Sequence, residues 1–74
     1  HQHIYVTNQE NALVGHINLE DLVLKNPKTR LSEILRKNDL VANVNDDREK
    51  IAHQMVHYKL MTVPVVGEQD VFLG

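Results

Sequence analysis

The sequence contains no cysteine and no tryptophan, and only 4% of its residues are aromatic. The absence of cysteine excludes disulfide bonds and thiolate metal sites, and it is typical of proteins from reducing compartments. Only two prolines and three glycines occur in 74 residues, and no glycine-rich loop of the phosphate-binding kind is present. No hydrophobic run approaches the roughly 20 residues that cross a bilayer.

Positive charge is also sparse. Eight basic and ten acidic residues give a net charge of −2, and the basic residues are scattered, so we expect no nucleic-acid partner. The hydrophobic fraction of 42% is typical of a folded, soluble chain. A domain of this size buries only about 60% of the surface of its unfolded chain. We therefore expect marginal stability or support from a partner.

Alternating and helical patterns of hydrophobic residues predict a mixed order of strands and helices. Two further signals mark the starts of helices. Asn18 is a good N-cap for a helix that follows the second strand, and Asp46 with Glu49 fits a capping box. The predicted strands are 4–7, 12–17, 40–44 and 61–66. The predicted helical segments are a short helix that begins at Asn18 and ends before Pro27, a turn at 31–35, and a helix from Asp46 to about Lys59.

The chain contains an internal repeat. Residues 63–74 align with residues 4–15 without a gap, which pairs Asn11 with Asp70 and Gly15 with Gly74. The alignment predicts two hairpins of one kind within a duplicated unit of strand, helix, strand, strand and helix, cut at both ends. Chance similarity is the alternative, because any two hairpins share this alternation.

Two stretches resemble the cystathionine β-synthase (CBS) domain, which occurs as a tandem pair: residues 12–22, ALVGHINLEDL, and residues 58–66, YKLMTVPVV. The resemblance implies an α/β (α+β) fold. It also implies that residues 1–25 are the C-terminal half of a first CBS motif and that 26–39 form a linker. Residues 40–74 would be a second motif that lacks the end of its last strand and its final helix.

A narrower resemblance, to MgtE-type magnesium transporters, is carried by DLVL at 21–24, NPKTRLSEIL at 26–35 and VNDDREKIA at 44–52. It implies a regulatory, ligand-sensing segment that gates transport in response to intracellular Mg²⁺. Such a segment would be a cytoplasmic domain of an inner (plasma) membrane protein. Its partners would be the transmembrane domain of the same polypeptide and a second copy, in a homodimer formed through the CBS motifs.

Asp46, Asp47 and Glu49 form the densest group of carboxylates. Mg²⁺ prefers oxygen ligands and often retains several waters, so these three residues are the candidate metal ligands. Helix capping is the alternative, and it accounts for Asp46 and Glu49 without an ion. The chain also departs from the resembled motifs, because Asn26, Asn45 and Lys59 each stand where the family has an acidic residue.

Asp21 and Asn18 are the candidate nucleotide-binding residues. In CBS pairs that bind adenosine compounds, an aspartate at the position of Asp21 contacts the ribose hydroxyls, and Asn18 stands where a serine or threonine is usual. AMP or ATP is therefore the alternative ligand to Mg²⁺, for a CBS module on a soluble or other protein. The plain alternative for Asp21 is a carboxylate that stabilises the first turn of a helix.

The histidines do not indicate a catalytic or zinc site. His53 and His57 are four residues apart on a predicted helix, but Gln54 occupies the place of the glutamate in a metalloprotease motif. We expect both to lie on a solvated helix face, and we expect His16 to lie on the surface of its strand. No nucleophile, base and orienting group can be combined from the sequence, so we expect no enzymatic activity.

Overall fold

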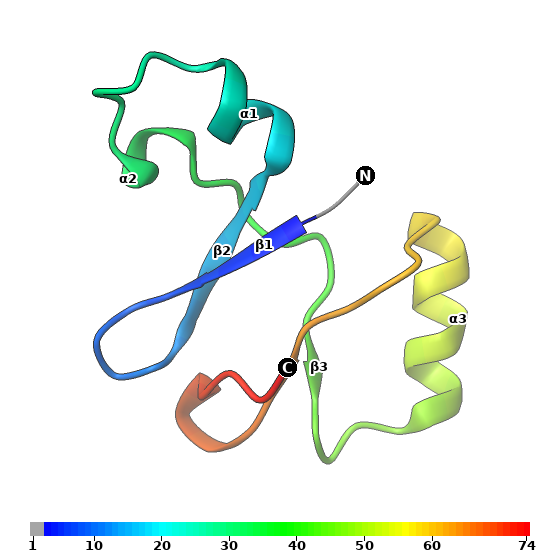
Figure 1. Cartoon of the computed structure of the whole chain (residues 1–74). Coiled ribbons are helices and arrows are strands. Elements are labelled where there is room, and N and C mark those ends of the chain that lie inside the picture. Colours follow the sequence, from blue (N-terminus) through cyan, green and yellow to red (C-terminus); the bar gives the residue numbers. More distant parts are fainter. Residues whose placement is uncertain (1–2) are drawn as a thin grey trace.

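The computed structural model describes residues 3–74, which form a mixed fold of short strands and helices (Figure 1). The expected α/β fold class is confirmed. No helix within the described residues is long and apolar enough to span a membrane. The elements follow the order β1 (His3–Thr7), β2 (Leu13–Asn18), α1 (Leu19–Leu24), α2 (Leu31–Ile34), β3 (Ala42–Asn43), α3 (Arg48–Tyr58), β4 (Val65–Val66) and the 3₁₀ turn η1 (Glu68–Asp70).

The first hairpin, made by β1 and β2, is antiparallel, with an irregularity after Val6. Its turn closes where the Asn8 amide donates to the Ala12 carbonyl at 3.0 Å. The Asn8 side chain also accepts hydrogen bonds from the Glu10 and Ala12 amides, each at 3.0 Å. Asn11 adopts a left-handed φ of 62°, which asparagine tolerates better than most residues. The local sequence therefore determines this turn.

The second hairpin runs from β4 to the end of the chain and closes with the equivalent hydrogen bond. The Gly67 amide donates to the Val71 carbonyl at 2.8 Å, and these residues align with Asn8 and Ala12 in the internal repeat. Asp70 has a φ of 59°, nearly that of Asn11, but Gln69 is also left-handed, with a φ of 56°, and the aligned Glu10 is not. The repeat of the hairpins is therefore present in the backbone, whereas the predicted division of the chain into two CBS motifs and a linker stays a prediction.

The two hairpins contact each other at equivalent positions. Ala12 and Val71 form an antiparallel bridge, and the Phe72 amide donates to the Asn11 carbonyl at 2.9 Å. Because the repeat aligns Ala12 with Val71, each hairpin presents the same position to the other.

β3 and β4 pair in parallel, with Ala42 opposite Val65 and Asn43 opposite Val66. Each strand is two residues long, so the predicted strands 40–44 and 61–66 were too long. Pro64 lies directly before β4, where its carbonyl accepts the Ala42 amide at 3.0 Å. Since proline has no amide hydrogen to donate, β4 begins after it.

α3 begins one residue later than the capping pattern predicts. Its N-cap is Asp47, whose Oδ1 accepts the Glu49 amide at 3.0 Å, so the predicted capping box of Asp46 and Glu49 was wrong. Asp46 instead closes the preceding turn, because its Oδ2 accepts the Asn43 amide at 2.8 Å. The helix ends at Tyr58, and its C-cap Lys59 adopts a left-handed φ of 58°.

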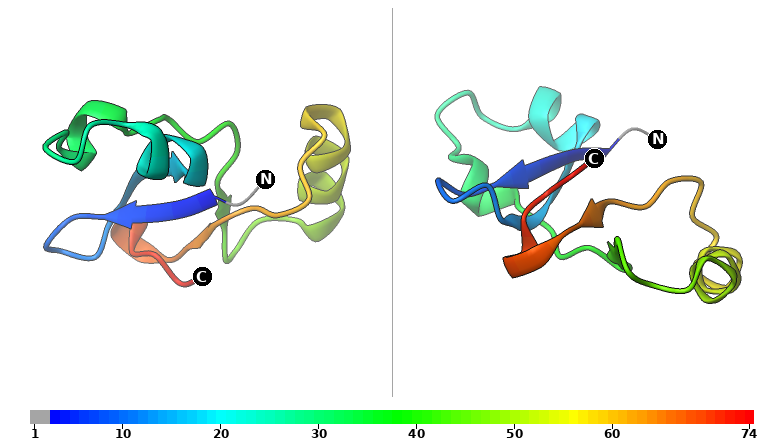
Figure 2. Two further views of the ribbon diagram at one scale, coloured as in Figure 1. Left: turned by 45° about the horizontal axis from the view of Figure 1, so that its top comes forward. Right: turned by 90° about the horizontal axis from the view of Figure 1, so that it is seen from below.

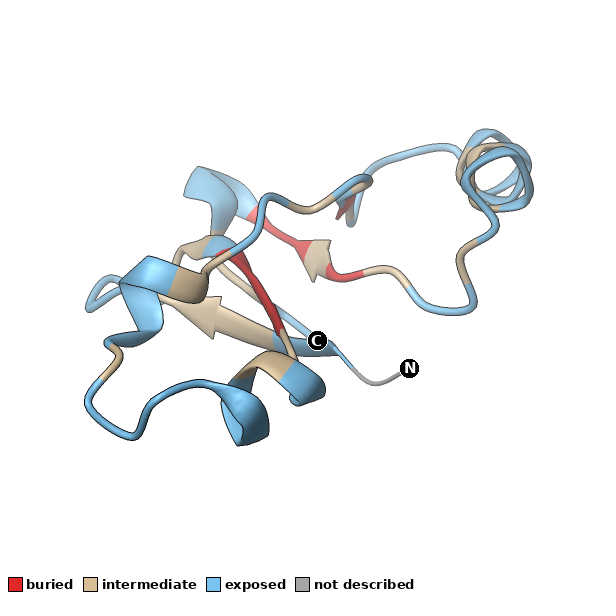
Figure 3. Ribbon diagram, turned by 90° about the horizontal axis from the view of Figure 1, so that it is seen from above, coloured by how far each residue is buried: buried red, intermediate tan, exposed pale blue. Residues whose placement is uncertain are grey.

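The core is small and divided between two places. Ile17 is the most deeply buried apolar side chain, with 1% of its surface exposed, and Ala42 and Val66 form the second buried group. Figure 3 shows these buried stretches along β2 and around β3 and β4. The molecule is flat, measuring 41 × 28 × 14 Å, and α3, which has no buried residue, lies at one end (Figure 2). A hollow of about 340 Å³ with largely apolar walls separates α3 from β3 and β4.

The segment between α1 and β3 is attached to β2. Two backbone hydrogen bonds join His16 and Arg36. The His16 amide donates to the Arg36 carbonyl at 2.9 Å, and the Arg36 amide donates to the His16 carbonyl at 2.8 Å. Gly15 allows this approach, since a Cβ there would lie 2.5 Å from the Arg36 carbonyl oxygen. The predicted helical turn at 31–35 is confirmed as α2.

Candidate functional site

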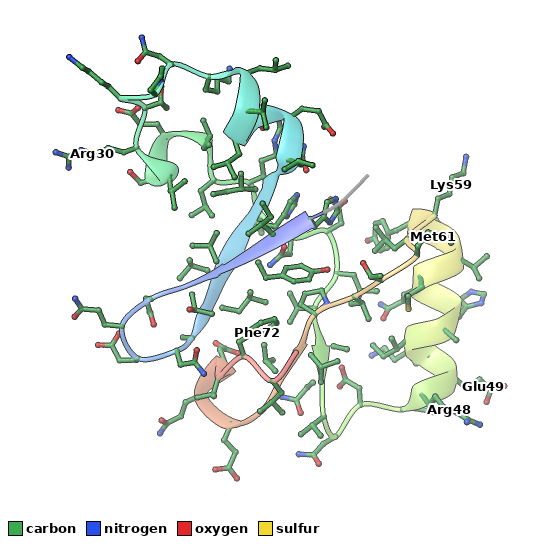
Figure 4. All side chains as sticks on the ribbon, viewed as in Figure 1. Arg30, Arg48, Glu49, Lys59, Met61 and Phe72 are labelled. Carbon is green, nitrogen blue, oxygen red and sulfur yellow. The ribbon has the colours of Figure 1, made fainter. Side chains whose placement is uncertain are left out.

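The three candidate metal ligands lie at and just before the start of α3, and all are exposed. Asp46 and Asp47 each bind a backbone amide through one carboxylate oxygen. Glu49 lies in the first turn of α3 and points outward (Figure 4). The acidic start of the helix is thus shaped partly by capping, as the alternative interpretation expected.

Residues 3–74 contain no group of three histidine, aspartate or glutamate side chains placed to hold a metal ion. The sequence puts Asp46, Asp47 and Glu49 close together along the chain, but the turn and the helix direct their carboxylates differently. Two oxygens already accept backbone amides, at 2.8 and 3.0 Å. The metal site therefore stays a prediction, and any ion bound here would need further ligands.

The two candidate nucleotide-binding residues lie at the start of α1. Asn18 is the N-cap, although its side chain makes no capping hydrogen bond. Asp21 lies in the first turn, three residues on, and residues at this spacing are neighbours on a helix surface. The structure therefore brings Asn18 and Asp21 to the same end of α1.

Asp21 is engaged by Arg36, a residue that the sequence analysis did not single out. The Nε and Nη2 of Arg36 donate to Asp21 Oδ2 at 3.0 and 2.8 Å. The Asp21 side chain is 17% exposed and that of Arg36 is 55% exposed. The pair of adjacent basic residues, Arg36 and Lys37, is the sequence signal that could have identified Arg36 as a site residue. Both lie in the stretch that was predicted to be a linker.

Two open hollows adjoin Arg36. One is lined by Asp21, Lys25, Glu33, Ile34, Leu35 and Arg36 itself. The other is lined by His3, His16, Asn18, Arg36, Lys37 and Asp39. Arg36 is therefore shared by the surroundings of Asn18 and of Asp21.

His16 is buried, with 7% of its surface exposed, so its predicted surface position was wrong. Its Nδ1 lies 2.8 Å from Asn38 Oδ1, and its ring stacks on His3 with centroids 4.3 Å apart. A buried polar group without a partner costs free energy, and Asn38 supplies the partner. Local sequence carried no signal for this contact between distant residues.

His53 and His57 are exposed on α3, as expected for a solvated helix face. The His57 ring packs edge-on against the neighbouring Tyr58 ring, with centroids 5.1 Å apart. Neither histidine belongs to a candidate metal site in residues 3–74.

No family model matches the chain. Over 72 residues, 97% of its length, the chain is 38% identical to "Magnesium transporter MgtE" of Enterococcus faecalis and 32% identical to that of Thermus thermophilus. A "Homoserine O-acetyltransferase" of Methanococcus vannielii is 32% identical over 80 residues. The chain spans only 16% of the length of each of these relatives.

Two solved structures share the fold, each with a TM-score of 0.86 over 97% of the chain. One is the cytosolic domain of the Mg²⁺ channel MgtE in complex with ATP, which is 32% identical, and the chain covers 29% of it. The other is the soluble part of a magnesium transporter, which is 38% identical, and the chain covers 28% of it. The chain is thus similar, in sequence and in fold, to one segment of the cytosolic part of MgtE magnesium transporters.

Proposed function

We propose that the chain is a regulatory segment on the cytosolic side of an MgtE-type magnesium transporter, where it helps to gate transport in response to intracellular Mg²⁺. The observation that carries the proposal is the 38% identity to an MgtE transporter over 97% of the chain. The shared fold of the soluble part of a magnesium transporter supports it. In this role the segment acts with the transmembrane domain of the same polypeptide, and as a homodimer.

In this proposal, the acidic start of α3 is the part of the chain that senses the ion. Asp46 and Asp47 each commit one oxygen to the backbone, and each carboxylate carries a second oxygen. Mg²⁺ is commonly bound through one or two carboxylates and several waters, so exposed carboxylates suit it. The remaining ligands would come from water or from another part of the transporter.

We also propose that the chain has no catalytic activity of its own. The matched stretch makes up only 16% of the homoserine O-acetyltransferase. A segment common to a transporter and to an enzyme is more consistent with an accessory module than with the catalytic part of either.

A chimeric transporter tests the gating proposal. The chain replaces the matching 72-residue segment of the Enterococcus faecalis transporter, and Mg²⁺ uptake into vesicles is followed at low and millimolar internal Mg²⁺. We expect uptake at low internal Mg²⁺ and its suppression at millimolar levels. A chimera that transports equally at both levels contradicts the proposal, provided that the unaltered transporter responds in the same vesicles.

Charge-neutralising variants then test the acidic residues. Asp46→Asn, Asp47→Asn and Glu49→Gln are combined, because asparagine keeps the N-cap. We expect half-suppression to need about tenfold more Mg²⁺, since carboxylate charge sets the affinity for the ion. Glu10→Gln, in the turn of the first hairpin, is the matched control. An unchanged response in the triple variant removes these residues from the sensor.

Adenine-nucleotide sensing is the second candidate function. It is favoured by the similarity to an MgtE cytosolic domain solved with ATP, and by the placement of Asn18 and Asp21 at one end of α1. A carboxylate can accept hydrogen bonds from both hydroxyls of a ribose. Calorimetry of the full chain with AMP and ATP should show binding that Asp21→Asn weakens at least about tenfold. No heat with either nucleotide removes this candidate.

A further inference from the structure

We propose that Arg36 is a specificity-determining residue of the candidate nucleotide site, and that it makes the chain prefer nucleoside phosphates to unphosphorylated nucleosides. This inference rests on the second candidate function, nucleotide binding near Asn18 and Asp21. It concerns which adenine compound the site binds most tightly. The sequence motifs assigned no role to Arg36.

The first observation is the contact between Arg36 and Asp21. Two guanidinium nitrogens donate to the same carboxylate oxygen, at 2.8 and 3.0 Å. Within residues 3–74 this is the only salt bridge. The guanidinium thus occupies one of the two oxygens through which Asp21 would accept the hydroxyls of a ribose.

The second observation is that the backbone of Arg36 is held by β2, whereas its side chain, bonded to Asp21, is largely exposed. Two hydrogen bonds to His16 in β2 hold the backbone, and the absence of a Cβ on Gly15 allows the close approach. More than half of the Arg36 side chain remains exposed to solvent. The guanidinium can therefore change its partner without any movement of the strand.

The third observation is what surrounds the guanidinium. Arg36 lines both the hollow that contains Asp21 and the hollow that contains Asn18, and the first of these also has Lys25 and Glu33 in its lining. The second hollow adds Lys37, and Asp39 is the one acidic residue among the described residues that line it. Two adjacent cations suit a phosphate, because arginine binds phosphate through paired hydrogen bonds and lysine adds charge.

These observations predict different binding free energies for a nucleoside and for a nucleoside phosphate. A nucleoside that takes the Asp21 carboxylate separates it from Arg36 and offers the guanidinium no anionic acceptor in exchange. A nucleoside phosphate takes the same carboxylate and offers phosphate oxygens to Arg36 and Lys37. Charge-assisted hydrogen bonds are about twice as strong as neutral ones, so the phosphate compensates for the separated ion pair.

Calorimetry of the full chain with adenosine, AMP, ATP and sodium triphosphate tests the inference. We expect the chain to bind ATP at least about tenfold more tightly than adenosine. In Arg36→Gln, adenosine should bind as tightly as before or more tightly and ATP more weakly, so that the affinity ratio approaches one. Arg36→Lys keeps the charge without the paired geometry and should give an intermediate ratio. Arg30→Gln, an exposed arginine that points away from the molecule (Figure 4), should leave the ratio unchanged.

The outcomes are distinguishable. An unchanged ratio in both Arg36 variants overturns the inference while nucleotide binding stands. Sodium triphosphate that binds as tightly as ATP also overturns it, because the site would then select anions and not nucleotides. No binding of adenosine, AMP or ATP to the unaltered chain overturns the second candidate function, and the inference fails with it. If Arg36→Gln does not fold, as judged by circular dichroism, the ratio in Arg36→Lys decides.

Discussion

The first and second hairpins close their turns with equivalent hydrogen bonds but differ in how much structure surrounds them. Both turns close with an amide-to-carbonyl hydrogen bond four residues apart, of 3.0 and 2.8 Å. Asn11 and Asp70 are left-handed at equivalent positions, and the second turn has Gln69 as a further left-handed residue. The first hairpin has a five-residue strand, β1, paired with β2. The second is built on β4, which has two residues.

The difference lies in what covers each strand. On β2, the buried run Gly15, His16 and Ile17 is covered by the segment that carries Arg36. In the second hairpin, Val66 is buried beside β3, but Leu73 remains more than half exposed. Turn chemistry therefore sets the shape of both hairpins, whereas burial depends on segments that are distant in sequence.

The largest expected effect comes from Ile17→Ala, which removes the most deeply buried side chain of the first hairpin. We expect it to lower the free energy of unfolding by about 3.5 kcal/mol. Val56→Ala, at a residue of α3 that is 78% exposed, should change it by less than about 0.5 kcal/mol. Urea denaturation followed by circular dichroism measures both. Equal effects would mean that the first hairpin does not carry the core.

Gly15→Ala should have the next largest effect, about 2 to 3 kcal/mol, because the new Cβ would overlap a backbone carbonyl that cannot move alone. Gly67→Ala is the matched change in the second hairpin. Its Cβ would meet a terminal carbon of the Leu73 side chain at 3.3 Å, and this flexible side chain can shift. We expect Gly67→Ala to lower the free energy of unfolding by less than about 1 kcal/mol. The same denaturation experiment measures both variants, and a larger loss in Gly67→Ala than in Gly15→Ala would contradict this prediction.

Asn11→Ala and Asp70→Ala test whether the two turns are equivalent. Alanine in the left-handed conformation costs about 1 to 2 kcal/mol, and both residues adopt that conformation. We therefore expect losses of similar size, with Glu10→Ala as the neutral control. A large loss of stability at one position and none at the other would show that the two turns, although similar in backbone, do not contribute equally to stability.

The smallest effect should follow Asp47→Ala, which removes the N-cap of α3 at a cost of about 1 kcal/mol. The helix buries no residue, so its fraying should stay local. We expect reduced helical circular dichroism with unchanged amide NMR shifts in β1 and β2. Shifts that change throughout β2 would show that α3 stabilises the first hairpin.

The sequence was sufficient for those parts of the fold that depend on local chemistry. Alternation and turn residues predicted both hairpins, and the spacing of Ile51 and Met55 predicted α3. The start of α3 was misplaced by one residue because Asp46 and Asp47 can both cap a helix, and the choice depends on the turn at Asn43.

Contacts between distant residues could not be predicted in the same way. The burial of His16 depends on Asn38 and on the bridge to Arg36, and neither follows from periodicity. For the candidate site, sequence motifs supplied Asn18 and Asp21, but the partner of Asp21 lies 15 residues further on. A basic residue in an apparent linker gives no local indication of what it binds.

The bridge between Ala12 and Val71 has a consequence for the origin of the fold. It joins two positions that the internal repeat makes equivalent, and contact between a residue and its own counterpart is the mark of an isologous interface. One hairpin pairing with a second copy of itself would form the same antiparallel bridge about a two-fold axis. Duplication of such a unit, followed by fusion, would place within one chain the contact that had joined two separate molecules.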